Sequence, residues 1–203
     1  ICVPTDVTDA DAVAALARAV DDEHGRLDVL VNNAYADGDH TPFLEADPED
    51  WRATMEVNLW GTLAVTRSMV DLLAASGDGR IVMVNSMSVQ KVERGFGAYV
   101  ASKGALAAVT KSLAVELGPL GIRVNGIHPG YIFGPAVEWY LNHLAEERGV
   151  TYQQVYDELA DETCLKYLPP ADEVAGAAVM LASPLARCIT GQSLGVNAGH
   201  VLT

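Results

Sequence analysis

The sequence contains few cysteines, no long apolar run and no histidine cluster. Its three cysteines, Cys2, Cys164 and Cys188, are odd in number and far apart, which argues against a disulfide framework and is typical of reduced thiols in the cytoplasm. The histidines form no i,i+4 pair and have no neighbouring cysteine, so we expect no metal site. No stretch reaches the roughly 18 apolar residues of a membrane span, and no charged-then-apolar leader opens the chain.

Basic residues are also scarce. The 203 residues include 13 lysines and arginines against 27 aspartates and glutamates, which gives a formal net charge of −14. A chain this acidic repels nucleic-acid phosphates and anionic lipid surfaces, so neither nucleic acid nor a membrane is an expected partner. Half of the residues are hydrophobic, which is enough for one domain with a substantial core.

Short apolar runs alternate with longer helical patterns along the chain. The pattern predicts strands at residues 1–4, 27–31, 80–85, 122–128 and 193–196, and helices at 9–24, 48–75, 97–117, 137–148, 152–163 and 171–182. Such alternation predicts an α/β fold with a parallel sheet that is covered by helices on both faces. Residues 131–170 are expected to form an insertion within a single domain.

The helices predicted at 48–75 and 97–117 carry small and apolar residues on more than one face. A helix that covers one face of a sheet needs only one apolar stripe, and further apolar faces indicate a second buried surface. We therefore expect both helices to pack against a partner subunit in a homodimer or homotetramer. The alternative is a thick core within one chain.

The most informative pair in the sequence is Tyr99 and Lys103, four residues apart within the predicted helix 97–117. Side chains at this spacing share one helix face. An ammonium group close to a phenol favours the phenolate, and it should lower the tyrosine pKa from about 10 toward working pH. A general base needs such a pKa. The alternative for this spacing alone is two unrelated surface residues.

Other polar residues and glycines lie where predicted strands end. Ser86, Asn33 and Gly130 each follow a predicted strand, and Ser86 precedes Tyr99 by thirteen residues. Ligands of open α/β sheets bind at the carboxyl ends of strands, so these residues should gather at one edge. Asn58 and Gly61 lie inside a predicted helix, where asparagine and glycine are unfavourable, so both need an explanation. Asn58 marks either a functional position or a structural kink.

These segments resemble the short-chain dehydrogenase/reductase family. The matching segments are Asp6-Val7, Asn32-Asn33-Ala34, Asn58, Ser86, Tyr99-x-x-x-Lys103, Pro129-Gly130, Thr190-Gly191-Gln192 and Val196-Asn197-Ala198-Gly199. They keep the order and spacing of the family along the whole chain, and jointly they are highly specific. The resemblance implies a Rossmann-like, doubly wound parallel sheet and an oxidoreductase that transfers a hydride between NAD or NADP and an alcohol or ketone.

The resemblance also implies roles for the catalytic side chains. Tyr99 would be the acid/base that exchanges a proton with the substrate oxygen, and Ser86 would hold and polarise that oxygen. Lys103 would lower the pKa of Tyr99 and hydrogen-bond the nicotinamide ribose. Asn58 would hold a water that links Lys103 to solvent. Ser88, eleven residues before Tyr99, is an alternative to Ser86.

The cofactor contacts are implied in the same way. The residues are Asp6, Val7, Asn33, Ala34, Tyr99, Lys103, Gly130 and Ile132. Asp6 and Val7 would lie at the adenine, and Asn33 and Ala34 at a ribose. Gly130 and Ile132 would lie at the nicotinamide. An alternative for Asp6 is to cap the helix that follows, although Thr8 and Asp9 are better placed for that.

One family feature is missing. The family opens with a strand and a glycine-rich turn that cradles the pyrophosphate at a helix start, and no such turn occurs here. We therefore expect residues 1–203 to be a single Rossmann-like domain that is truncated at its amino terminus and lacks the first βαβ portion. The residue that selects NAD or NADP would lie in that portion. Tyr35 and Gly134 also differ from the residues usual in the family at these positions.

Residues 131–170 correspond to the substrate loop of the family and contain seven of the thirteen aromatic residues. The basic residues there are Arg148 and Lys166. An aromatic lid with little positive charge favours an apolar alcohol or ketone over a small carboxylate or a phosphorylated substrate. The alternative is that these aromatic side chains only pack the lid helices together.

Other functions compete with this interpretation. A non-catalytic NAD(P)-binding regulator could use the same fold without the four catalytic residues, which are intact here, and an inactive fragment is a further alternative. A serine hydrolase would need a G-x-S-x-G elbow, whereas Ser86 lies in Val-Asn-Ser-Met-Ser. A related epimerase or dehydratase shares Tyr-x-x-x-Lys, but the short length and the Thr-Gly-Gln…Ala-Gly ending favour a simple reductase.

Overall fold

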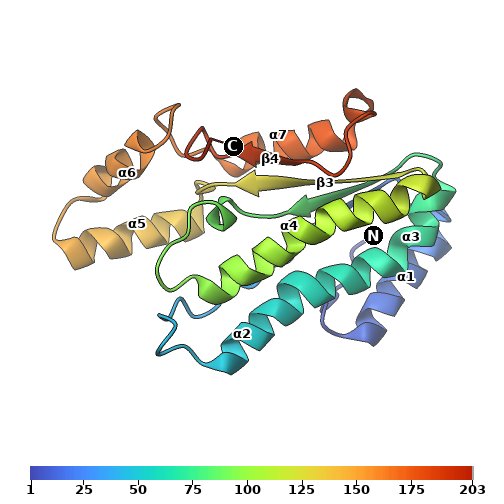
Figure 1. The fold of residues 1–203 in the computed structure, drawn as a ribbon, viewed down its shortest axis with the longest axis horizontal. Coiled ribbons are helices and arrows are strands. Elements are labelled where there is room, and N and C mark those ends of the chain that lie inside the picture. The colour runs from blue at the N-terminus through green and yellow to red at the C-terminus, as the bar shows by residue number, and fades with distance from the viewer. Residues whose placement is uncertain (203) are drawn as a thin grey trace.

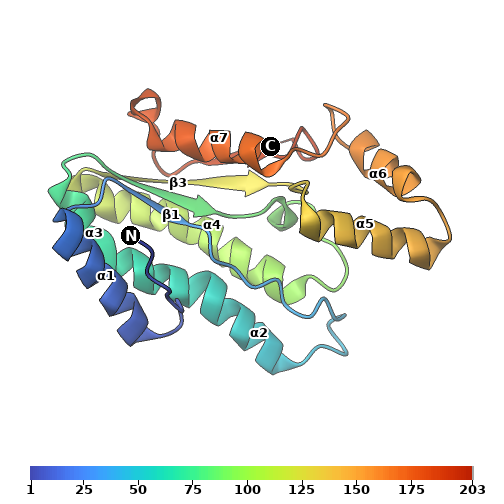
Figure 2. The same ribbon diagram turned by 180° about the vertical axis from the view of Figure 1, so that it is seen from behind.

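A computed structural model describes residues 1–202 and places a parallel sheet between two layers of helices (Figures 1 and 2). Within these residues the sheet has four strands in the order β1-β2-β3-β4, and every pairing is parallel. The strands are β1 (Val29–Asn32), β2 (Gly79–Val84), β3 (Ile122–Pro129) and β4 (Ser193–Val196). The prediction of an α/β, Rossmann-like parallel sheet is confirmed.

Helices cover both faces of this sheet. The helices are α1 (Ala10–His24), α2 (Pro48–Met55), α3 (Thr62–Ala75), α4 (Gly97–Leu117), α5 (Pro135–Arg148), α6 (Tyr152–Asp161) and α7 (Ala171–Ala182). Figure 1 shows α7 on one face and α1, α3 and α4 on the other. Short 3-10 turns occupy Met87–Val89, Gly118–Leu120 and Pro184–Ala186.

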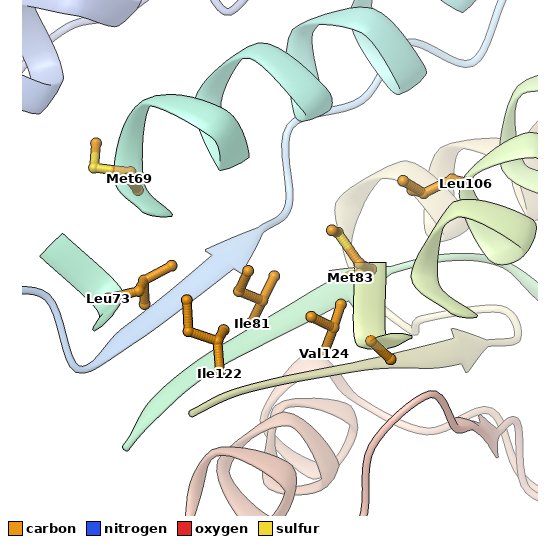
Figure 3. Close-up of a cluster of buried hydrophobic side chains, with 8 residues drawn as sticks. Met69, Leu73, Ile81, Met83, Leu106, Ile122 and Val124 are labelled. Carbon is orange, nitrogen blue, oxygen red and sulfur yellow. The ribbon is translucent and has the colours of Figure 1, made fainter. Parts of the chain in front are cut away.

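The core lies on both sides of β2 because side chains of a strand alternate between its two faces. Ile81 and Met83 point toward α3 and α4, where they pack with Leu73 and Leu106 (Figure 3). Val82 points the other way, into a cluster that α7 completes. A strand buried on both faces is typical of parallel sheets, and this burial explains the continuous apolar run in the sequence.

The prediction of a strand at residues 1–4 is wrong. This segment has no regular secondary structure, and Ile1 is largely exposed. A strand exists only where a neighbouring strand satisfies its backbone groups. Within the described residues β1 is the edge of the sheet and pairs with β2 alone, so the segment has no strand to pair with.

The prediction of one helix over 48–75 is correct in extent but not in regularity. A π-helical segment, Glu56–Gly61, lies between α2 and α3. It contains Asn58 and Gly61, whose presence in a helix the sequence left unexplained. A Cβ atom on Gly61 would lie 2.7 Å from Cγ2 of Val7, so the close approach of the amino-terminal segment requires glycine here.

Helices α5 and α6 lie beyond the carboxyl end of β3 (Figure 1), in the segment 131–170 that the sequence predicts to be a lid and that is called the lid below. The lid has a small core of its own around Leu141, Val155 and Leu168. No helix among residues 1–202 is long and apolar enough to cross a membrane. The same residues include no group of three or more histidine, cysteine or acidic side chains arranged to hold a metal ion.

Candidate active site

Two cavities meet at the carboxyl ends of β2 and β3. The first cavity measures about 110 Å³ and includes Lys91 and Glu93 in its wall. The second cavity measures about 280 Å³ and includes Asn33, Lys103 and Ile132. Four residues line both cavities, namely Ser86, Tyr99, Gly130 and Tyr131. The predicted serine and tyrosine therefore stand where a molecule in one cavity would touch a molecule in the other.

Ser86 lies directly after β2, where it caps a short 3-10 turn. Its Oγ accepts hydrogen bonds from the backbone N–H of Ser88 at 3.1 Å and from the Ser88 hydroxyl at 2.9 Å. Ser88 lines only the first cavity, whereas Ser86 lines both. This geometry favours Ser86 over Ser88 as the residue that contacts the reacting oxygen.

The main chain of Ser86 is held by a buried histidine. His128, the seventh residue of β3, is 6% exposed, and its Nδ1 lies 2.7 Å from the carbonyl oxygen of Ser86. A carbonyl can only accept a hydrogen bond, so Nδ1 of His128 must carry a proton. The contact joins the ends of β2 and β3 at the serine.

Tyr99 and Lys103 share one face of α4, as their spacing predicts. The Lys103 Nζ lies 5.7 Å from the centre of the Tyr99 ring, and it donates a hydrogen bond of 2.8 Å to the carbonyl oxygen of Val84. Lys103 is 2% exposed. Burial lowers the pKa of its amine to about 8, because a low-dielectric interior disfavours the charged form.

The expectation that Lys103 lowers the pKa of Tyr99 is wrong for this structure. Burial raises the pKa of Tyr99, and the hydrogen-bonding interaction with Ser86 acts in the opposite direction. The Lys103 amine lies over the ring, 5.7 Å from its centre, and its charge does not offset the effect of burial on the phenol. The phenol is therefore held in its neutral form at neutral pH.

Asn58 joins α4 to the loop that follows β1. Its Nδ2 donates to the Ala36 carbonyl at 2.7 Å and to the Ser102 hydroxyl at 2.8 Å, and its Oδ1 accepts from the Ala36 N–H at 2.7 Å. The side chain is fully buried. Asn58 is therefore hydrogen-bonded to Ser102, the residue that precedes Lys103 on α4. It also fixes the loop that includes Tyr35.

The predicted cofactor residues divide into two groups. Asn33, Tyr99, Lys103, Gly130 and Ile132 line the second cavity. Asp6, Val7 and Ala34 do not line either cavity.

Asp6 and Val7, which line neither cavity, contact other parts of the protein. Asp6 accepts hydrogen bonds from the N–H and hydroxyl of Thr8, while Asp9 caps α1. Val7 packs against Gly61. The capping alternative for Asp6 is therefore wrong, and its cofactor role stays a prediction.

Tyr35, where the family usually has glycine, enters the site. Its ring lies edge-on to that of Tyr99 with centres 6.5 Å apart, and Lys103 Nζ lies 5.8 Å from its centre. The amine thus lies close to two phenol rings. Gly134 has backbone angles near the extended region and precedes α5.

A group of charged residues in the site was missed at the sequence level. Lys91 and Glu93 line the first cavity, and Lys91 Nζ contacts both Glu162 from the end of α6 and His200 near the chain end. Lys91 and Glu93 lie in the sequence between Ser86 and Tyr99, and this position could have placed them in the site. No sequence pattern connects Glu162 or His200 with them.

Residues 1–200 match a protein-family model described as Enoyl-(Acyl carrier protein) reductase. The chain is 34% identical over 195 residues to the short-chain reductase protein NovJ of Streptomyces niveus, covering 96% of this chain and 72% of that protein.

Two solved structures are also similar. The L-sorbose reductase of Gluconobacter frateurii, solved with NADPH and L-sorbose, has a TM-score of 0.91 and 30% identity over 99% of this chain and 76% of the other. An NAD+-bound xylitol dehydrogenase has a TM-score of 0.85 and 27% identity over 95% of this chain and 76% of the other.

Proposed function

The chain belongs to the short-chain dehydrogenase/reductase family of NAD(P)-dependent oxidoreductases, and we propose that it interconverts an alcohol and a ketone with Tyr99 as the acid/base. The observation that carries this proposal is the junction of the two cavities at Ser86 and Tyr99. Hydride transfer needs a nicotinamide ring and a carbonyl carbon in contact. A substrate in the first cavity and a nicotinamide in the second would meet at these two hydroxyl groups.

Four side chains support the chemistry at this junction. The nicotinamide, when bound, supplies or accepts the hydride. Ser86 holds the substrate oxygen by a hydrogen bond, and Tyr99 exchanges a proton with that oxygen. Lys103 holds the nicotinamide ribose at the floor of the second cavity. Asn58 fixes the surrounding loop and would hold the water that connects Lys103 with solvent.

The neutral state of Tyr99 bears on the direction of proton transfer. Since burial raises the pKa of its phenol, the group carries its proton at neutral pH. A neutral phenol is a proton donor, which the reduction of a ketone to an alcohol requires. In the opposite direction the same residue must first lose its proton, so alcohol oxidation should be favoured at alkaline pH.

The second cavity fits the nicotinamide end of the cofactor. Gly130 is in close contact with Asn197, because a Cβ atom at this position would lie 2.9 Å from the asparagine Cβ. Gly130 and Ile132 both line this cavity, where a nicotinamide ring would lie. Asn33 would contact a ribose. We also assign Ala34, Asp6 and Val7 to the cofactor, on family likeness alone.

Replacement of Tyr99 by Phe tests the proposal. We expect Tyr99→Phe to lower kcat by about 100- to 10,000-fold, the usual contribution of an acid/base group, while NADH or NADPH still quenches protein fluorescence. Tyr152→Phe is the control, since Tyr152 packs in the lid and lines neither cavity. A non-catalytic regulator would instead bind the cofactor with no turnover in the unmodified protein.

The remaining features are consistent with a small-molecule enzyme of the cytoplasm. All three cysteines are free and exposed, which suits a reducing compartment. Residues 131–170 would act as a substrate lid within a single domain, because α5 and α6 extend from the strand that ends at the site. Exposed small and apolar residues on α4 and around Trp60 would form the surface between subunits of a homodimer or homotetramer.

A further inference from the structure

Most of the wall of the first cavity is apolar, and three polar side chains from one segment interrupt it beside Ser86 and Tyr99. They belong to Ser88, Lys91 and Glu93. These groups come from the segment between Ser86 and the start of α4 at Gly97. A substrate whose oxygen touches Ser86 and Tyr99 must place its remaining atoms along this wall.

The lid aromatics contribute little of the apolar surface of this cavity. Phe133, Tyr140, Tyr152 and Tyr156 pack in the small core of the lid around Leu141, and the Phe133 and Tyr156 rings meet edge to face. Only Tyr131 of the lid aromatics lines the first cavity. The alternative that these residues hold the lid helices together is therefore the one that the packing favours, and they give no support to an apolar substrate.

The charge of Lys91 is already matched within the protein. Its Nζ pairs with Oε2 of Glu162 and lies 2.5 Å from Nε2 of His200, which in turn lies 2.9 Å from the same carboxylate oxygen. The group holds the segment after Ser86 against the lid and the end of the chain. An anionic substrate would have to compete with Glu162 for this amine.

Glu93 is only partly satisfied. Its Oε1 accepts a hydrogen bond of 3.0 Å from the Tyr131 hydroxyl. Among residues 1–202 no side chain donates to its other carboxylate oxygen, although the residue is half-buried and lines the first cavity. This oxygen is not among the buried side-chain atoms that lack a partner, so solvent reaches it in the free protein. Burial under an apolar ligand would remove that hydration and would be unfavourable.

We propose that the substrate is a small neutral polyhydroxylated compound, a polyol or its ketose, and that one of its hydroxyl groups donates to Glu93. A carboxylate or phosphate ester would meet the charge of Glu93 with no free cation beside it. The alkyl part of an alkanol or alkyl ketone would cover the carboxylate without offering it a donor. The rings of Phe96 and Tyr131 supply apolar surface for the C–H groups of such a compound. The inference rests on the proposed function and narrows its substrates from alcohols and ketones in general to polyols and ketoses.

A turnover panel tests the substrate class. The panel contains polyols and ketoses of four to six carbons, alkanols and ketones of the same lengths, and matching hydroxy acids, each with NAD and NADP. We expect the polyol or ketose to have a kcat/KM about 10- to 100-fold above the chain-length-matched alkanol or ketone, since a site built to bond a hydroxyl discriminates against its absence.

Two variants assign this preference to Glu93. Glu93→Gln keeps an acceptor for the Tyr131 hydroxyl but turns the free carboxylate oxygen into a donor group. We expect it to lower kcat/KM for the polyol by about 10-fold or more and to leave the value for the alkanol within twofold. Glu93→Leu should remove the preference altogether. Glu146→Gln, an exposed position on α5, is the matched control and should change neither value.

Preference of the unmodified protein for the alkanol or the hydroxy acid would overturn the inference, as would an equal loss on both substrates in Glu93→Gln. Either result leaves the proposed function intact, because turnover would still depend on Tyr99. Cofactor binding without turnover of any compound in the panel would instead overturn the proposed function, and the substrate class with it.

Discussion

Lys103 is one of the most deeply buried side chains in residues 1–202. The proposed reaction needs its amine in the second cavity, but burial of that amine lowers the stability of the folded protein. Burial lowers its pKa from 10.5 to about 8. Below pH 8 the folded protein must bury a charged amine, which lowers the free energy of unfolding. Between pH 8 and 10.5 the unfolded chain keeps the proton and the folded protein releases it, so this penalty decreases as pH rises.

Lys103→Met should therefore raise stability while it abolishes turnover. We expect the variant to exceed the unmodified protein in free energy of unfolding by up to roughly 3 kcal/mol below pH 8, with a difference that narrows toward pH 10. Urea unfolding at several pH values measures it. Lys111→Met on the same helix is the control, because Lys111 is exposed in the folded protein. A difference in the free energy of unfolding between Lys103→Met and the unmodified protein that does not vary with pH would contradict this explanation.

His128 acts on the reaction through Ser86 and is a positioning residue. His128→Leu removes the donor to the Ser86 carbonyl and should cost about 1–3 kcal/mol in the free energy of unfolding. With the serine less firmly placed, we expect kcat to fall by about 10-fold or more with a smaller change in KM.

Asparagine offers the matched comparison for this position, because its Nδ2 can occupy the place of the imidazole Nδ1. We expect His128→Asn to recover most of kcat relative to His128→Leu. Steady-state kinetics with both variants settle the question. Equal kcat values in the leucine and asparagine variants would show that the imidazole only fills space.

At the scale of elements, sequence reasoning succeeded where a signal was local. The face shared by Tyr99 and Lys103 follows from a spacing of four residues, and the cap of α1 at Asp9 and its end at Gly25 follow from residue type. Asn58 and Gly61 were recognised as unusual in a helix. Their cause, contacts with Ala36 and Val7, joins segments far apart in the chain and has no local signature.

Electrostatics and long-range partners could not be predicted in the same way. The pKa of Tyr99 depends on how deeply α4 buries its phenol, which spacing does not encode. The contact of Lys91 with Glu162 and His200 depends on how the lid and the chain end fold back. The strand predicted at residues 1–4 failed because its pattern was apolar but its pairing partner is absent from the described residues.

The contact between Gly61 and Val7 gives a test at this scale. Alanine has the higher helix propensity, yet its Cβ would lie 2.7 Å from the Val7 side chain and 3.0 Å from the Val7 carbonyl oxygen. We expect Gly61→Ala to lower the free energy of unfolding by about 1–3 kcal/mol. In Gly176→Ala on α7, where the new Cβ meets nothing within 4 Å, stability should rise by about 0.5–1 kcal/mol. A gain in both variants would mean that residues 1–9 do not pack as described.

At the scale of the whole molecule, the outer surface of α4 is the feature that one chain does not use. Its inner face is buried through Ser102, Leu106, Thr110 and Ala114. The outer face carries small residues at helical spacing, including the exposed Ala101 and Ala108, and ends near Val115, which is 77% exposed. Small residues in such a row allow two helices to approach closely, which supports the proposal that α4 packs on its counterpart in another subunit.

Ala108→Arg tests this surface. A charged side chain in the middle of a close helix contact is both too large and unpaired when buried, so we expect the variant to lower the molar mass in solution by at least half relative to the unmodified protein. Light scattering coupled to size-exclusion chromatography measures the mass, and circular dichroism verifies that the fold is kept. Ala15→Arg, an exposed alanine on α1, should leave the mass unchanged. If the unmodified protein were monomeric, or if both arginine variants kept its mass, the apolar outer face of α4 would need another explanation than self-association.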